Sequence, residues 1–241
     1  MAHVRYDAMF FDAGMVLLDF PNWEERIRTA LTGLGHRPTE AQIRAGADAA
    51  LAWLQTQPEQ DLLPTWEAED QHTLGQAQAI VDRVGIADLD PRYIRDTCYF
   101  GYVCRPFQEV LTVLQELRDL GLGIGVISNA PPSLRAVLTR LGITALVDHI
   151  TLSSDIGVLK PNADIYRHAL KALGTEARSS VFADDLPQNV EGARAVGFGS
   201  AYVVDRAQVT GRPDAIRTLN VLPALLAATS PIGRLALADP R

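Results

Sequence analysis

The chain of 241 residues is poor in cysteine and lysine, with two of each, and it contains no long apolar segment. Cys98 and Cys104 match no metal-ligand or redox spacing, so we expect a reducing, cytoplasmic compartment. Because no run of apolar residues is long enough to cross a bilayer, we predict no membrane partner. The net charge is −7 and no basic stretch offsets it, which argues against a nucleic-acid partner.

The composition is that of an ordinary globular enzyme, with 47% hydrophobic and 21% charged residues. After a first apolar segment at 6–11, short apolar segments alternate with longer amphipathic ones from Pro106 onward. We predict strands at 123–127, 148–152, 179–183 and 200–204, and helices at 107–119, 133–140, 162–173 and 188–195. Such alternation predicts an α/β fold with a doubly wound parallel sheet.

Residues 22–98 have a different character and predict only helices. We expect an N-cap at Asn22, a capping box from Thr39 to Gln42, and further helices at 65–84 and 90–99. Because this block follows the first strand, we predict an all-helical cap domain inserted into the sheet domain. The expected domains are a core at 1–19 and 100–229 and a cap at 20–99, followed by a flexible tail at 230–241.

Four polar signals follow apolar segments in a fixed order along the chain. They are Asp12, Ser128-Asn129, Lys160 and Asp184-Asp185. The carboxyl ends of parallel strands converge on one crevice, so these side chains are expected to meet there. A carboxylate, a hydroxyl, a cation and an acid pair suit the binding of a phosphoryl group and Mg²⁺ beside a nucleophilic carboxylate.

The segments FFDAGMVLLD, VISN, GVLKPNADIY and VFADDLPQNVEGARAVGF together resemble the four motifs of the haloacid dehalogenase-like (HAD) hydrolase superfamily. The resemblance extends to about residue 205 and implies a Rossmann-like core with a helical cap. It implies that Asp12 attacks phosphorus to form an aspartyl-phosphate, and that Ser128 and Asn129 hold phosphoryl oxygens. It also implies that Lys160 neutralises Asp12 and the bound anion.

The same resemblance implies a Mg²⁺ site. Asp12, the backbone carbonyl of Gly14 and Asp184 would be direct ligands, and Asp185 and Asn189 would act directly or through water. Oxygen ligands with several retained waters are what Mg²⁺ prefers.

The first motif departs from the family pattern, because Gly14 stands where phosphatases usually carry a second acid. That acid protonates the leaving alcohol, and general acid–base catalysis contributes about 10²–10⁴-fold. We hypothesise that a substrate hydroxyl, metal-bound water or a cap residue substitutes, with His72 and Asp70 as the cap candidates.

The function we predict is Mg²⁺-dependent hydrolysis of a small, sugar phosphate-like monoester, with a monomer and a homodimer both open. The alternatives are a metal-independent 2-haloacid dehalogenase and a catalytically impaired protein that binds a phosphorylated ligand. A phosphonoacetaldehyde hydrolase needs a cap lysine, and residues 20–99 contain none. Aromatic and basic cap residues are candidates for substrate contacts, although core packing or solvation is the commoner role of such residues. They are Trp23, Trp53, Trp66, Tyr93, Tyr99 and Phe100, with Arg26, Arg28 and Arg44.

Overall fold

The structure, a computed structural model, describes residues 6–57, 60–212 and 215–227. Its centre is a six-stranded sheet in the order β5-β4-β1-β6-β7-β8, in which every pairing is parallel. The strands are β1 (Ala8–Phe11), β4 (Gly123–Ser128), β5 (His149–Leu152), β6 (Ser180–Asp184), β7 (Ser200–Val204) and β8 (Ala215–Ile216). The first strand of the chain therefore lies in the middle of the sheet, between β4 and β6.

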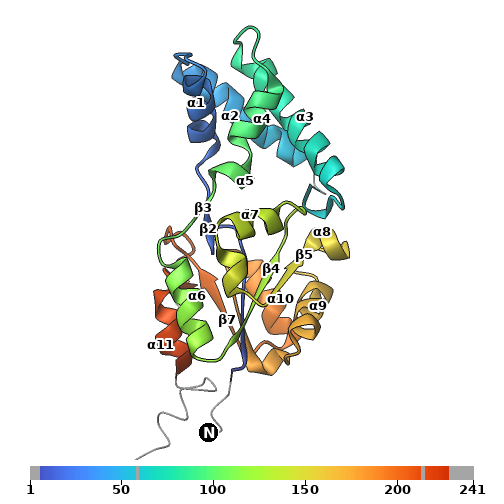
Figure 1. The fold of residues 1–241 in the computed structure, drawn as a ribbon, viewed down its shortest axis with the longest axis vertical. Helices are drawn as coiled ribbons and strands as arrows, with labels where there is room; N and C mark the ends of the chain where they lie inside the picture. Colours follow the sequence, from blue (N-terminus) through green and yellow to red (C-terminus); the bar gives the residue numbers. More distant parts are fainter. Residues whose placement is uncertain (1–5, 58–59, 213–214, 228–241) are drawn as a thin grey trace, which may run out of the picture.

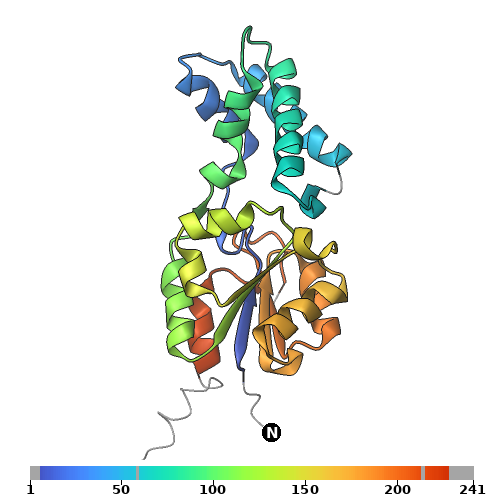
Figure 2. The same cartoon turned by 45° about the vertical axis from the view of Figure 1, so that its right-hand side comes forward.

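Helices cover both faces of the sheet, as Figures 1 and 2 show. One face packs against α6 (Val110–Asp119), α7 (Leu134–Arg140) and α11 (Leu222–Ala227), and the other against α9 (Ala163–Leu173) and α10 (Pro187–Val196). Successive residues of β1 contribute to opposite layers: Met9 and Phe11 to the first, Ala8 and Phe10 to the second. Burial on both faces explains why β1 is apolar throughout.

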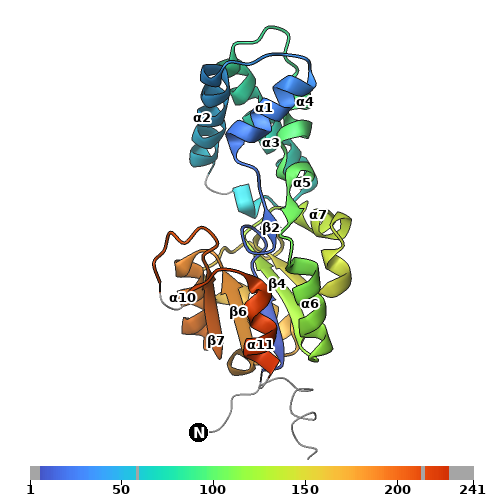
Figure 3. The same cartoon turned by 90° about the vertical axis from the view of Figure 1, so that its left-hand side faces the viewer.

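A second group of helices, which we call the helical unit, stands beyond the carboxyl ends of the strands (Figure 3). It consists of α1 (Trp23–Gly33), α2 (Glu40–Thr56), α3 (Trp66–Val84) and α4 (Pro91–Cys98), with the short 3-10 helix η1 (Gln60–Leu62) between α2 and α3. These helices share a hydrophobic core of their own, which includes Ile27, Leu31, Ile80 and Ile94.

The chain passes between the two parts through short segments. Strands β2 (Leu18–Asp19) and β3 (Arg105–Pro106) pair antiparallel where the chain leaves and re-enters the sheet domain, and α5 (Phe100–Val103) follows α4. On the other side of the junction, α8 (Ser153–Ile156) follows β5 and packs near η1. These elements fix the position of the helical unit above the strand ends.

The predicted fold class is confirmed, and so are the main helices and strands of the core, to within a few residues. The predicted caps at Asn22 and Thr39 are also present, with a capping box at Thr39 and Gln42. The division into core and cap domains stays a prediction, and the tail at 230–241 lies outside the described residues.

Gly125 of β4 gives a test of this packing. A Cβ at Gly125 would lie 2.4 Å from Cδ1 of the fully buried Phe10, whereas at Gly123 the nearest atom is Leu173 Cδ2 at 3.4 Å. We expect Gly125→Ala to lower the free energy of unfolding by about 1–3 kcal/mol because the core becomes overpacked. Gly123→Ala, on the same strand, should change it by less than about 1 kcal/mol. Urea unfolding curves measure both, and equal stabilities of the two variants would contradict the described packing.

Candidate active site

Three of the sequence-predicted residues lie at the carboxyl ends of adjacent strands. Asp12 follows β1, Ser128 ends β4 and Asp184 ends β6. The register pairs Phe11 with Val126 on one side and with Ala183 on the other, so Asp12 lies between the other two residues. The Asp12 N–H continues the ladder by donating to the Ala183 carbonyl at 2.9 Å.

Lys160 joins the two aspartates at the centre of the site. Its Nζ lies 2.7 Å from Asp12 Oδ1 and 2.6 Å from Asp184 Oδ2. The lysine side chain is only 1% exposed. Burial by itself lowers the pKa of Lys160, but Asp12 and Asp184 outweigh it and hold that pKa above its usual value. The ammonium is therefore charged when it meets both carboxylates.

Asn129 holds the backbone that carries this lysine. Its Oδ1 accepts from the Lys160 N–H at 2.7 Å, and its Nδ2 donates to the Lys160 carbonyl at 3.1 Å. The two bonds tie the loop after β4 to the loop before α9. Both ends of the Asn129 side chain are thus occupied, so its direct role in this structure is to position Lys160.

Asp184 is fixed by two neighbours from the start of α10. Its Oδ1 accepts from the Leu186 N–H at 2.8 Å, and Asn189 Nδ2 donates to both carboxylate oxygens at 3.0 and 3.1 Å. Asn189 Oδ1 is buried and has no hydrogen-bond partner within the part of the chain that the structure describes. A buried oxygen acceptor without a partner is uncommon and matches the predicted oxygen-rich site.

Three carboxylates gather where the sequence predicts a metal ion. Oxygen atoms of Asp12, Asp184 and Asp185 lie within 4.8 Å of one another. Burial and the charge of Asp184 raise the pKa of Asp12 although Lys160 opposes them. Burial and the charges of Asp12 and Asp184 raise the pKa of Asp185 to about 7. Such crowding of acids is relieved by a divalent cation, so these residues fit a hard, oxygen-seeking ion.

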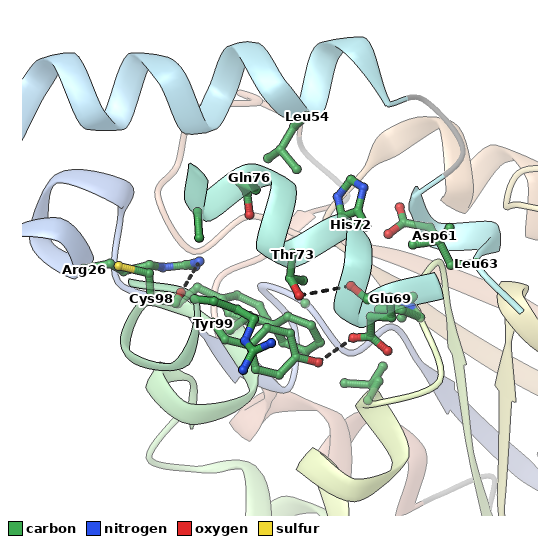
Figure 4. Close-up of a pocket in the computed structure, with 18 of the residues that line it drawn as sticks. Arg26, Leu54, Asp61, Leu63, Glu69, His72, Thr73, Gln76, Cys98 and Tyr99 are labelled. Atoms are coloured by element: carbon green, nitrogen blue, oxygen red, sulfur yellow. Dashed lines mark hydrogen bonds between the residues drawn. The ribbon is translucent and has the colours of Figure 1, made fainter. Parts of the chain in front are cut away.

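A cavity of about 430 Å³ lies between the sheet domain and the helical unit, and its lining includes Ala13 and Gly14, which directly follow Asp12 (Figure 4). Gly14, Ser128 and Asn129 line it from the sheet domain, and residues of α1, α3 and α4 line it from the helical unit. Glu69 connects the two walls, because it accepts hydrogen bonds from the Ser133 N–H at 3.1 Å and from the Ser133 and Tyr99 hydroxyls. The cavity is therefore closed on this side by a direct link between the two parts.

The cap residues predicted to contact substrate, together with His72 and Asp70 as candidates for the missing acid, divide into two groups. Trp23, Arg26, Tyr99, Phe100 and His72 line the cavity. The others do not line it. Trp66 is 55% exposed, and Tyr93 packs against the core of the helical unit. Arg28 pairs with Glu40, and Asp70 pairs with Arg95. Trp53 and Arg44 also lie outside the lining of the cavity.

Asp61 of η1 was not predicted from the sequence, yet it lines the same cavity as Gly14 and Ser128. Burial and the nearby charge of Asp12 raise the pKa of Asp61 to about 6. Its carbonyl accepts a hydrogen bond from the Ser153 hydroxyl, which fixes η1 against the sheet domain. Asp61 therefore adds a further carboxyl group to the wall that the helical unit contributes to this cavity.

The chain belongs to the haloacid dehalogenase-like hydrolases, whose family model matches residues 6–197. The resemblance inferred from the four motifs is thereby confirmed. Among curated relatives, it is 36% identical to Phosphatase MT3486 of Mycobacterium tuberculosis over 127 residues, which cover 52% of this chain and 58% of that protein. It is 32% identical to an (S)-2-haloacid dehalogenase of a Pseudomonas species over 117 residues, covering 48% and 50% of the two chains.

Among solved structures, the L-2-haloacid dehalogenase of Xanthobacter autotrophicus superposes with a TM-score of 0.65 at 21% identity. That match covers 93% of this chain and 100% of the dehalogenase, and it supports the fold alone. The chain spans about half the length of the two curated relatives. Phosphatases and dehalogenases both occur among the relatives, so the reaction has to be argued from the site.

The raised pKa of Asp185 predicts a pH-dependent stability. Its folded pKa of about 7 exceeds the ordinary value of 3.8, so the folded chain retains a proton that the unfolded chain loses. Stability from this group is present at low pH and is lost as the pH rises toward 7. In metal-free buffer, Asp185→Asn should therefore gain stability over the parent chain at pH 8, and gain less at pH 5. Urea unfolding at both values measures this; a gain independent of pH would contradict the assigned shift.

Proposed function

We propose that this chain is a Mg²⁺-dependent phosphatase that hydrolyses a small phosphate monoester, with Asp12 as the nucleophile. The observation that supports this most is the position of Lys160, whose ammonium lies 2.7 Å from Asp12 and 2.6 Å from Asp184. An anionic nucleophile can approach an anionic phosphoryl group only if nearby positive charge offsets their repulsion. Lys160 supplies that charge within a buried site.

The chain's own residues account for the two halves of the reaction. The Asp12 oxygen that is not bonded to Lys160 attacks phosphorus, and the bond from phosphorus to the alcohol oxygen breaks. The buried Ser128 hydroxyl, at the end of β4, is placed to donate to a phosphoryl oxygen. Water then releases phosphate from the aspartyl-phosphate and regenerates the Asp12 carboxylate.

The residues present fit Mg²⁺, because oxygen atoms of three carboxylates lie within 4.8 Å of one another and the nearby Asn189 Oδ1 has no hydrogen-bond partner among the described residues. Asp12, Asp184 and Asp185 would hold the ion together with the Gly14 carbonyl and, directly or through water, Asn189. When bound, Mg²⁺ supplies further positive charge to the phosphoryl oxygens. The acidic pair Asp184-Asp185 favours this reaction over carbon–halogen cleavage, which by family resemblance needs no metal.

We further propose that Asp61 serves as the acid that Gly14 lacks. Both residues line the same cavity as Ser128, and burial and the charge of Asp12 raise the pKa of Asp61. Asp70 points away into an ion pair with Arg95 2.7 Å away, and burial lowers the pKa of His72. The Glu69 carboxylate already accepts hydrogen bonds from Ser133 and Tyr99, so Asp61 is our candidate for proton transfer.

A 2-haloacid dehalogenase is the second candidate, and Gly14 is the observation that favours it. Without the second acid, Asp12 could attack carbon and displace a halide, which needs no proton. The two reactions differ in product and in metal requirement, so one experiment separates them.

We expect the purified chain to release phosphate from an aryl phosphate only when Mg²⁺ is present. Asp12→Asn should lower kcat by about a thousandfold or more, because it removes the nucleophile. Asp19→Asn makes the same change at an exposed position seven residues later and should leave kcat unchanged. Chloride release from 2-chloropropionate in the presence of EDTA, without phosphatase activity, would contradict the proposal and select the dehalogenase.

The role of Asp61 predicts a rescue. Asp61→Asn should lower kcat for alkyl phosphates by about 10²-fold or more, whereas the exposed Asp70→Asn should have little effect. A Cβ at Gly14 would meet only Phe20, at 3.4 Å, so an acid can be introduced there. Adding Gly14→Asp to Asp61→Asn should restore much of the lost kcat. If Asp61→Asn leaves the pH profile and kcat of alkyl phosphate hydrolysis unchanged, Asp61 has no part in proton transfer.

A further inference from the structure

We infer that the substrate carries an apolar organic group in place of the polyhydroxylated group of a sugar phosphate. This inference rests on the proposed phosphatase function and names the class of ester that the site accepts. The evidence for it is the set of residues that line the cavity together with Ser128 and Gly14, and the hydrogen bonds that the polar side chains among them make.

The cavity is lined mainly by apolar side chains. From the helical unit come Trp23, Leu54, Leu63, Ala77, Ile80, Ile94 and Cys98, and from the junction and the sheet domain come Ala13, Phe20, Phe100, Ala130, Pro131 and Leu134. Its volume of about 430 Å³ is within the range of sites that enclose a whole organic ligand. Burying an apolar group there is favourable by about 25 cal/mol per Å² of apolar surface.

Several polar side chains of the same walls already make hydrogen bonds within the protein. Arg26 donates to the Pro21 carbonyl at 2.7 Å and stacks on Trp23 at 4.6 Å. Gln76 donates to the Ala50 carbonyl at 3.3 Å, and the Thr73 hydroxyl donates to the Glu69 carbonyl at 3.0 Å.

One acidic and one basic side chain of the cavity, Glu69 and Arg95, also bind other residues of the protein. The Glu69 carboxylate accepts from Ser133 and Tyr99, and Arg95 pairs with Asp70 and Asp96. Figure 4 shows the Tyr99–Glu69 bond across the cavity. Sugar hydroxyls buried against these walls would lose their bonds to water and find few partners, which is unfavourable for each unpaired group.

Asp61 and His72 are two further polar side chains in the lining of the cavity, and Figure 4 labels both. Leu54, Ile80 and Ile94 add apolar surface to the same cavity. The site thus combines a polar end for the phosphoryl group with an apolar chamber for the alcohol.

A matched pair of esters tests this inference. Cyclohexylmethyl phosphate and glucose 6-phosphate are both esters of a primary alcohol on a six-membered ring, and they differ mainly in hydroxyl content. With Mg²⁺ we expect kcat/KM to be about tenfold or more higher for cyclohexylmethyl phosphate. An equal or higher value for glucose 6-phosphate would overturn the inference and leave the phosphatase proposal intact.

If neither ester is hydrolysed, the phosphatase proposal fails and calorimetric binding of the two esters decides the inference. Tighter binding of cyclohexylmethyl phosphate would support an apolar chamber, and equal or weaker binding would overturn it.

Leu54 and Leu51 provide matched variants on α2, because Leu54 lines the cavity whereas Leu51 is 48% exposed outside it. Leu54→Asn should raise KM, or the dissociation constant, for cyclohexylmethyl phosphate severalfold, by about one order of magnitude at most. It should leave the value for glucose 6-phosphate unchanged or lower. Leu51→Asn should change neither. A similar loss for both esters in Leu54→Asn would show a general defect and would contradict the assigned chamber.

Discussion

The contact between the Lys160 ammonium and the two carboxylates of Asp12 and Asp184 is the interaction on which the site depends. Burying two acids beside each other at adjacent strand ends is unfavourable unless a cation accompanies them. With Lys160 in place the cluster is tolerated, and Asp12 remains available to react. Asn129 on one side and Asn189 on the other hold this arrangement through short side-chain bonds.

The helical unit adds specificity to this charged centre. It stands above the strand ends and contributes apolar residues such as Trp23, Ile80 and Ile94 to the cavity. Glu69 ties it to the sheet domain through Ser133, so the closed arrangement in the structure has a definite hydrogen-bonded basis. In the proposed reaction the sheet domain supplies the nucleophile and the lysine, and the helical unit supplies Asp61 and apolar walls around the alcohol.

Much of this arrangement could be predicted from the sequence. The strand ends carrying Asp12, Ser128 and Asp184 follow short apolar runs, and parallel pairing brings such ends together. The very short elements β2, β3, α5 and α8 could not be predicted, because two to four residues carry no measurable periodicity. Asp61 was missed for the same reason: it lies in a single 3-10 turn with no motif around it, and only tertiary packing brings it near Asp12.

The choice between phosphate and halide chemistry, and the class of alcohol, also exceeded what the sequence could settle. The default expectation of a sugar phosphate came from family resemblance, whereas the hydrogen bonds that occupy Gln76, Arg26 and Glu69 become visible only in three dimensions. Cavity polarity depends on which polar groups are already paired, and a list of residues does not contain that information.

The most direct test of the central claim is a crystal structure of the chain with Mg²⁺ and beryllium fluoride, a mimic of a phosphoryl group. The account predicts beryllium bonded to an Asp12 oxygen, with its fluorides near Ser128 and Lys160 and one metal ion shared by Asp12 and Asp184. An anion bound elsewhere, or a metal ion that contacts only one of the two aspartates, would contradict it.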